Sequence, residues 1–206
     1  MLIDGGHTYA VLQEVLSSMA PVVLPAFTAD DVLPDGEYSM TFADLRASIL
    51  AQPDPNNANW DFAWRARLVD NLEIMVLELW AVGVTKVFVD GSFVENKDHP
   101  NDIDGYFECD LHYLATGALE RDLNVRNPHK VWTWDHTQRS PGNGKLQLPM
   151  WHRYRVELYP HVPGFGCGIS DQHGNELEFP AAFRKSRNNH TPKGIIRILP
   201  TTGVTP

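Results

Sequence analysis

Two short groups of residues have the types and spacing that phosphate and metal chemistry needs. Gly91 and Ser92 follow an apolar, β-branched stretch, and Asp102 and Asp104 open a stretch in which polar and apolar residues alternate. Glycine lets the backbone turn sharply and approach a ligand closely, while the amide and hydroxyl of Ser92 can hold phosphate oxygens. Asp102 and Asp104 stand two apart on an expected strand, so their carboxylates point to the same face.

Two carboxylates on one face suit a hard divalent cation that also binds a nucleoside triphosphate, because Mg²⁺ prefers a few carboxylates together with phosphate oxygens. In sites with two ions about 3.5–4 Å apart, a third carboxylate usually helps to hold one of them. Glu157 is the candidate, because it lies in an expected strand among β-branched and apolar residues. The alternative is that Glu157 only pairs with Arg153 or Arg155.

The segment VFVDGSFVENKDHPNDIDGYFE (87–108) resembles the signature of the DNA polymerase β-like nucleotidyltransferases. In that superfamily a Gly-Ser pair after a strand precedes Asp-x-Asp by about ten residues, as it does here. Together with LPDGEYSMTFADL upstream and KGIIRI downstream, this sequence is similar to those of a group of small bacterial nucleotidyltransferase-like proteins.

The resemblance implies a metal-dependent nucleotidyltransferase that moves a nucleoside monophosphate from an NTP, such as ATP, to an acceptor with loss of pyrophosphate. It also implies a minimal nucleotidyltransferase fold and two divalent ions, Mg²⁺ or Mn²⁺. The catalytic and metal-binding residues would be Asp102, Asp104 and Glu157, and the nucleotide-binding residues Gly91, Ser92 and Lys97. Glu157 is alternatively a general base, and Lys97, Arg153 or Arg155 would neutralise the pyrophosphate. The acceptor stays open between RNA, a protein and a small molecule.

Two other functions compete with this one. The acidic first half also suits an inactive module that binds a nucleotide or a partner protein, as in a toxin–antitoxin or other defence pair. A weaker hypothesis is an RNA-modifying enzyme that docks RNA on residues 121–155. Three tryptophans (Trp132, Trp134 and Trp151) could stack a base, although packing is the favoured role for at least two of them.

Composition excludes several classes of protein. The 206 residues carry 17 basic and 26 acidic side chains, a net charge of −9, which argues against a general nucleic-acid coat protein. No apolar run is long enough to cross a membrane, the first residues do not read as a secretory signal, and two cysteines make no disulfide framework. We therefore expect a cytoplasmic protein without a membrane partner.

The charge is divided unevenly along the chain. Residues 1–110 carry 5 basic and 19 acidic side chains, a net of −14, whereas residues 111–206 carry 12 and 7, a net of +5. The two halves are either complementary within one fold or place a basic wall opposite a carboxylate cluster.

The elements that must position these residues follow from periodicity and turn signals. The sequence predicts an α/β (α+β) fold in which a mixed sheet is flanked by helices. We expect one nucleotidyltransferase-like domain over 1–206, with an extension over 1–40 that packs on it and a loop or insertion over 124–149. The expected helices are 7–19, 41–50, 61–82 and 111–123. The expected strands are 84–90, 102–110, 150–162 and a final strand or docking tail at 193–200, with an extended connection at 21–39 and a hairpin or turn at 171–179.

Overall fold

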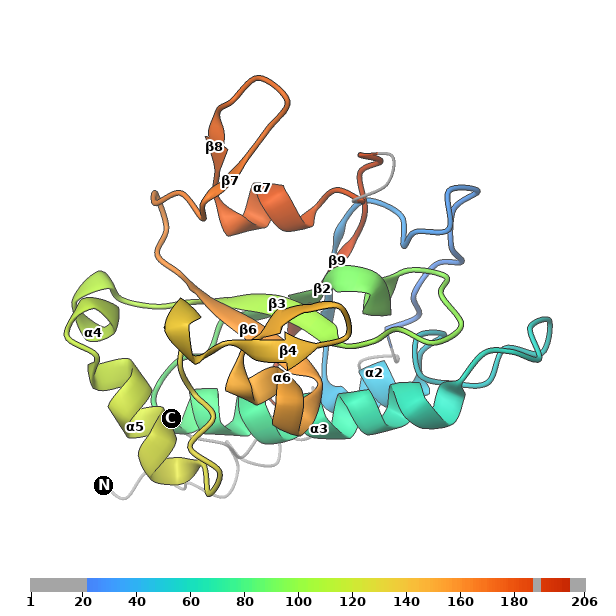
Figure 1. Ribbon diagram of the computed structural model, residues 1–206. Coiled ribbons are helices and arrows are strands. Elements are labelled where there is room, and N and C mark those ends of the chain that lie inside the picture. Colours follow the sequence, from blue (N-terminus) through green and yellow to red (C-terminus); the bar gives the residue numbers. More distant parts are fainter. Residues whose placement is uncertain (1–21, 187–189, 201–206) are drawn as a thin grey trace, which may run out of the picture.

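The centre of the molecule is a five-stranded mixed sheet with the strand order β1-β9-β2-β3-β6 (Figure 1). The computed structural model describes residues 22–186 and 190–200. The strands are β1 (Glu37–Met40), β2 (Val87–Asp90), β3 (Ile103–Glu108), β6 (Val156–His161) and β9 (Ile195–Ile198). β1 is parallel to β9 and β3 to β6, whereas β2 is antiparallel to both its neighbours. The predicted mixed α/β fold is confirmed, and the expected helix 7–19 lies outside the described residues.

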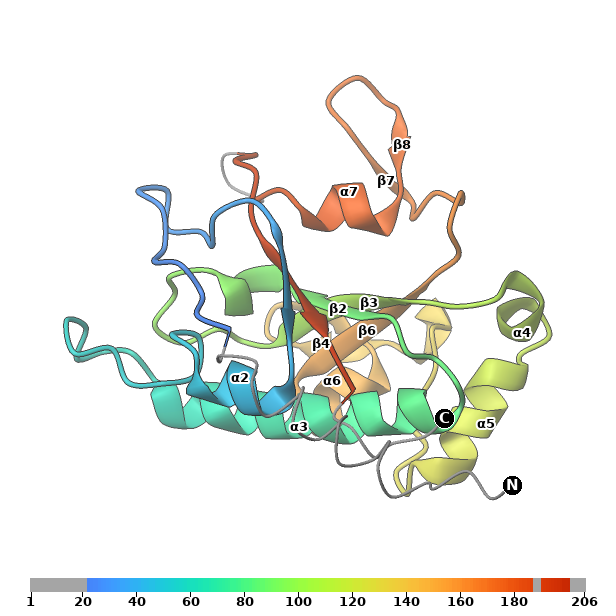
Figure 2. The same cartoon turned by 180° about the vertical axis from the view of Figure 1, so that it is seen from behind.

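One face of the sheet is covered by the long helix α3 (Phe62–Ala81), as the leucine periodicity predicts (Figures 1 and 2). The Asp61 side chain accepts a hydrogen bond from the Trp64 amide and begins the helix, which ends just before Gly83 with its left-handed φ of 85°. Apolar side chains of the helix pack in one cluster with the side chains on this face of the sheet, among them Leu68, Leu72, Met75, Val87, Val89, Ile103, Phe107, Val156 and Leu158.

The short helix α2 (Phe42–Ala47) begins with the predicted capping box. The Asp44 amide donates to the Thr41 hydroxyl, and the Thr41 amide donates to the Asp44 carboxylate. Phe42 and Leu45 are buried in the same core as α3.

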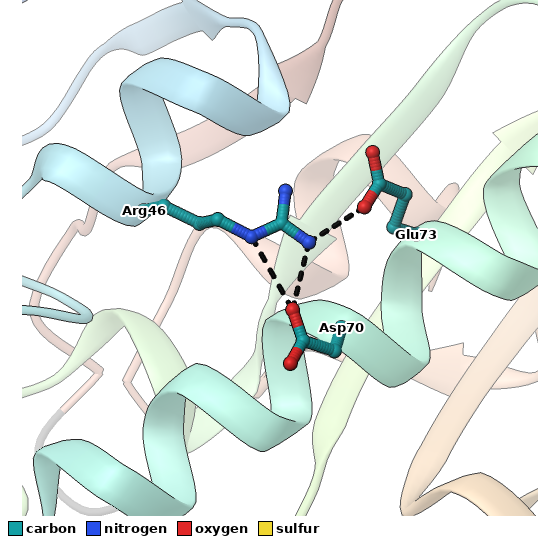
Figure 3. A network of polar contacts seen from close by, with 3 residues as sticks. All are labelled: Arg46, Asp70 and Glu73. Atoms are coloured by element: carbon teal, nitrogen blue, oxygen red, sulfur yellow. Dashed lines mark hydrogen bonds and ion pairs between the residues drawn. The ribbon is translucent and has the colours of Figure 1, made fainter.

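Ion pairs also join α2 to α3. The Arg46 guanidinium lies 2.7 Å from Asp70 and 2.6 Å from Glu73 (Figure 3). Because about a third or more of each of these side chains is exposed, the pairs add only about 0–1 kcal/mol each. Burial of the apolar face of α2 therefore contributes more to its docking than these ion pairs do.

The opposite face of the sheet carries a smaller aromatic cluster under α7 (Phe179–Phe183). Tyr106 stacks on Phe88 and on Phe179, and Phe183 meets Tyr106 edge-on. The hairpin of β7 (Ile169–Ser170) and β8 (Glu176–Leu177), which the sequence predicts, lies on the same side (Figures 1 and 2). The sheet is thus covered on both faces.

Three expectations about the elements are wrong. The stretch 150–162 is not one strand: α6 (Pro149–Tyr154) comes first, Arg155 turns the chain with a left-handed φ of 57°, and only then does β6 begin. Pro149 stands in the first turn of α6, where proline is well tolerated, and this signal favours a helix. The stretch 111–123 is two helices, α4 (Leu111–Ala115) and α5 (Ala118–Arg126), separated by Gly117. The connection 21–39 contains most of β1.

The predicted loop 124–149 also contains structure. It holds the end of α5, a 3₁₀ turn η2 (His136–Gln138) and the hairpin of β4 (Ser140–Gly142) and β5 (Lys145–Gln147). Asn143 and Gly144 both have positive φ at the hairpin turn, as Asn-Gly in a two-residue turn favours. None of the helices in the described part of the chain is long and apolar enough to cross a membrane.

Candidate functional site

Three acidic residues form a row across three neighbouring strands. Asp90 at the end of β2 stands opposite Asp104 near the start of β3, and Asp104 stands beside Glu157 near the start of β6. Alternation along each strand puts all three on the face that carries Tyr106, and all three are buried. Carboxylates that lie together at one end of neighbouring strands repel one another, and a cation or a positively charged ligand offsets this repulsion.

A cavity of about 290 Å³ opens at Asp104, the middle residue of this row. It is lined by Gly91, Ser92, Glu95, Lys97, Asn101, Asp102, Asp104, Asn143, Lys145, Ser186 and Lys193. The structure therefore brings together five of the six residues that the sequence predicts for the site. The sixth, Glu157, is not among the residues that line the cavity.

Gly91 opens the 3₁₀ turn η1 (Gly91–Val94), which follows β2 directly. Its φ is 74°, and a Cβ atom placed on it would lie 2.8 Å from Oδ2 of Asp104. Both facts require glycine, because other residues rarely adopt this backbone and none fits so close to the carboxylate. The turn thus brings the backbone into direct contact with Asp104.

Asp102 lies just before β3 and is held by a tryptophan. The Trp151 indole N–H donates to Oδ2 of Asp102 over 2.7 Å. Trp151 belongs to α6, so the helix that the sequence misses fixes the orientation of a predicted site residue. The other two tryptophans serve packing: Trp132 is in the core and Trp134 packs against it.

Glu157 makes two strong hydrogen bonds. Its Oε1 accepts from the Leu148 amide over 2.9 Å, and its Oε2 accepts from the Tyr159 hydroxyl over 2.6 Å. The Tyr159 hydroxyl also lies 3.3 Å from the Arg139 guanidinium, which in turn donates to the Leu146 carbonyl of the β4–β5 hairpin. Glu157 is thus connected to the hairpin that carries Asn143 and Lys145 into the cavity.

The two arginines suggested as partners of Glu157 make other contacts. Arg153 lies over the Tyr154 ring and Arg155 over the Trp151 ring. Arg153 lines neither this cavity nor a second cavity that adjoins it. Arg155 lines the second cavity but not this one.

Lys193 is a buried cation in the wall of the cavity. Its Nζ lies 3.0 Å from Asp90, 2.9 Å from Glu95 and 3.2 Å from the Gly91 carbonyl. Burial lowers the pKa of Lys193, but the attraction of Asp90 and Glu95 outweighs it and raises the pKa above the usual value. Lys193 is therefore charged, and it ties the end of β2 to the segment that leads into β9.

Asp90 is almost fully buried, and burial raises its pKa to about 8 although Lys193 opposes the shift. Asp104 and Glu95 add to the rise because their charges repel a second carboxylate. Asp90 thus holds its proton far more strongly than an exposed aspartate does.

The donor chemistry of the cavity fits a hard cation bound together with phosphates. Asp102 and Asp104 supply carboxylate oxygens, which Mg²⁺ and Mn²⁺ prefer. Across residues 22–186 and 190–200, no group of three or more His, Cys, Asp or Glu side chains is arranged to hold a metal ion. Asp102 and Asp104 are the residues that would hold such an ion, together with ligands from its substrate.

Comparison with known protein families matches residues 25–199 to the family described as "Family of unknown function (DUF6932)". The chain belongs to this family. The DUF6932 match spans both aspartates, the Gly-Ser turn and Lys193. No curated protein and no solved structure matches the chain.

A buried arginine of this DUF6932 chain positions the loop after the Gly-Ser turn. Arg65 on α3 is fully buried and stacks 3.7 Å over the Trp60 ring. Its guanidinium donates to the carbonyls of Phe93, Glu95 and Lys97. It also donates to the carbonyl of Leu50, which lies shortly after the end of α2. Burial lowers the pKa of Arg65 to about 9.

Sequence reasoning misses Arg65, Asp90 and Lys193. The sequence carries only a weak signal for each: Arg65 is one of two arginines near the start of the long helix, Asp90 ends an expected buried strand, and Lys193 begins another expected strand. Each depends on a partner far away in the chain, which only the fold brings close.

Proposed function

We propose that this protein is a metal-dependent nucleotidyltransferase that moves a nucleoside monophosphate from an NTP to an acceptor hydroxyl. One observation carries the proposal: Gly91, Ser92, Asp102 and Asp104 line a single cavity. Lys97 and Lys145 line it too, and neither has an ion pair within the described part of the chain. Carboxylates and unpaired cations around one cavity are what a triphosphate bound with a cation requires.

In this reaction the acceptor oxygen bonds to the α-phosphorus, and the bond from that phosphorus to the β-phosphate oxygen breaks. Pyrophosphate leaves with the electron pair, and the acceptor proton passes to solvent. The Ser92 amide and hydroxyl would bind phosphate oxygens, and Lys97 and Lys145 would offset the charge of the pyrophosphate. Asp102 and Asp104 would hold a Mg²⁺ or Mn²⁺ ion, which supplies further charge neutralisation and polarises the reacting oxygens.

Glu157 can have one of two roles in this reaction, as a metal ligand or as a positioning residue. Its place beside Asp104 supports the role of third carboxylate for a second ion. Its bonds to Leu148 and Tyr159 support a positioning role instead. We favour positioning, because both oxygens already accept hydrogen bonds from groups that hold the β4–β5 hairpin.

The test uses each α-labelled NTP in turn with purified protein, Mg²⁺ or Mn²⁺ and a whole-cell extract as the source of acceptor. We expect label to enter RNA, protein or a small molecule with the wild type and not with the Asp102→Asn, Asp104→Asn double variant. Equal labelling by both proteins would overturn the assignment of the aspartates.

A nucleotide- or partner-binding module without catalysis is the second candidate, favoured by the two hydrogen bonds that already engage both oxygens of Glu157. NTP binding without label in any acceptor, together with a partner protein that co-purifies, would support that module, as in a toxin–antitoxin pair.

A further inference from the structure

A second cavity of about 390 Å³ adjoins the carboxylate cavity. The two share Asn101 and Asn143, so a single ligand can extend from one into the other. The side walls of the second cavity include Trp64, His99 and Arg155.

One wall is a pair of stacked rings that is fixed in place. Trp64 and His99 lie nearly parallel, with ring centroids 5.1 Å apart and an interplanar angle of 11°. The Trp64 indole N–H donates to the Pro100 carbonyl, and His99 Nδ1 lies 2.9 Å from Asp61 Oδ2. Both rings are therefore preorganised, and the loss of side-chain entropy on binding a ligand is small.

Another wall is a guanidinium lying on an indole. The Arg155 guanidinium sits 3.7 Å from the centroid of the Trp151 ring. Arg155 has no ion pair within residues 22–186 and 190–200, so its charge and its five N–H donors remain available to a ligand. The same Trp151 donates its N–H to Asp102, which links this wall directly to the carboxylate cavity.

We propose that the second cavity binds the planar base of the nucleotide whose phosphates lie in the carboxylate cavity; this rests on the proposed function. Flat rings and guanidinium planes stack on nucleobases of any kind. The amides of Asn101 and Asn143 can both donate and accept, as the polar edges of bases require. Because these two residues line both cavities, they lie where base and sugar would meet the phosphates.

The test compares two kinds of probe, the four NTPs and inorganic tripolyphosphate. Calorimetry measures the binding of each in the presence of Mg²⁺. The variants are Arg155→Gly and His99→Ala, with Arg153→Ala as a matched control that removes a neighbouring arginine lining neither cavity. Glycine suits the left-handed backbone at position 155, so the fold is preserved, and thermal unfolding verifies this.

We expect both variants to weaken the binding of at least one NTP by about fivefold or more, which is the loss that one stacking contact brings. Binding of tripolyphosphate should stay the same in both, and Arg153→Ala should bind both probes like the wild type. Lys145→Ala should weaken both probes together. If no NTP distinguishes Arg155→Gly and His99→Ala from the wild type while tripolyphosphate binds, the base site is overturned and the phosphate site stands.

The failure of the phosphate site on which the proposed function depends gives a different result. Wild-type protein would then bind neither tripolyphosphate nor any NTP. To separate the two cases, the four nucleosides are titrated as well. Nucleosides that bind the wild type and lose affinity in Arg155→Gly would keep the base site although the phosphate site had failed.

Discussion

The buried carboxyl group of Asp90 makes the stability of the fold depend on pH. Its pKa of about 8 in the folded protein lies above the usual value of 3.8. Between these two values the folded state binds more protons than the unfolded chain, so the free energy of unfolding falls as pH rises. Lys193 limits this loss because its charge favours the ionised carboxylate.

We predict that this decrease is visible between pH 5 and pH 8 and is reduced by Asp90→Asn, which has no proton to lose. The measurement is urea denaturation of both proteins across this range. Parallel stability curves for the two proteins would contradict the raised pKa.

Asp104 stands between Asp90 and Glu157 in the row of acids. We predict that Asp104→Asn lowers nucleotidyl transfer by at least about a hundredfold, since a group that stabilises developing charge is lost. In protein without added metal the same change should raise stability, because it removes repulsion with Asp90. Labelled transfer and urea denaturation measure the two effects. Full turnover by the variant would refute the proposed role.

Glu157 offers a sharper distinction between ligand and positioning residue. We predict that Glu157→Gln lowers stability by about 1–3 kcal/mol, because the hydrogen bonds of a buried carboxylate are weakened. The Mg²⁺ concentration for half-maximal transfer should stay unchanged. Titration of Mg²⁺ at saturating NTP measures this. A shift of tenfold or more in that concentration would make Glu157 a metal ligand.

The sequence locates the cavity residues well and their partners poorly. Gly91, Ser92, Asp102 and Asp104 are recognisable because turn chemistry and strand alternation act over a few residues. Lys193 could not be assigned to Asp90, because sequence order says nothing about which strand will lie beside β2.

At the scale of elements, α3 does more than cover the sheet. Through Arg65 it fixes the carbonyls of the loop that carries Lys97 into the cavity. A charged donor satisfies these carbonyls, so the position of the loop depends on a buried side chain of α3 that does not line the cavity itself.

We predict that Arg65→Met destabilises the fold by about 3 kcal/mol or more, because several buried carbonyls lose their donors. Arg46→Met on α2, whose ion pairs are exposed, should cost about 1 kcal/mol or less. Thermal and urea unfolding of the two variants compare these values. Equal losses would show that the buried guanidinium is not special.

Local patterns predict the elements that are long and regular. The leucine spacing gives α3, and strict alternation gives β3. Local patterns fail to predict short elements, because tertiary packing determines whether they are helix or strand. The helix α6 has only six residues, and its apolar side chains Met150, Trp151 and Tyr154 also suit a strand.

At the scale of the whole molecule, the uneven charge of the sequence resolves into pairs between the halves. Lys193 from the basic half lies 3.0 Å from Asp90 and 2.9 Å from Glu95 of the acidic half, and Arg197 and Arg184 lie within 4 Å of Glu37. Lys145 lies in the same cavity as Asp102 and Asp104. These pairs fit the first interpretation, complementary halves within one fold, whereas a basic wall opposite the carboxylates stays a prediction.

β9 is the strand that unites the sheet, since it pairs with β1 on one side and β2 on the other. We predict that a chain ending at residue 192 fails to unfold cooperatively, because β1 loses β9, its one neighbour among the described strands, and Asp90 loses Lys193. A chain ending at residue 200 should unfold like the full chain. Circular dichroism during heating measures both, and a cooperative transition in the shorter chain would contradict the prediction.

The position of β9 also has a consequence for synthesis on the ribosome. β1, β2, β3 and β6 all leave the exit tunnel before β9 does, yet β1 and β2 are separated by the place that β9 will fill. Until β9 emerges, β1 and β2 each expose a strand edge whose backbone N–H and C=O groups lack the strand that will pair with them. Exposed edges of this kind favour aggregation of nascent chains or the recruitment of chaperones. Lys193 emerges with β9, so the last strand completes the sheet and brings the counter-ion of Asp90 in one event.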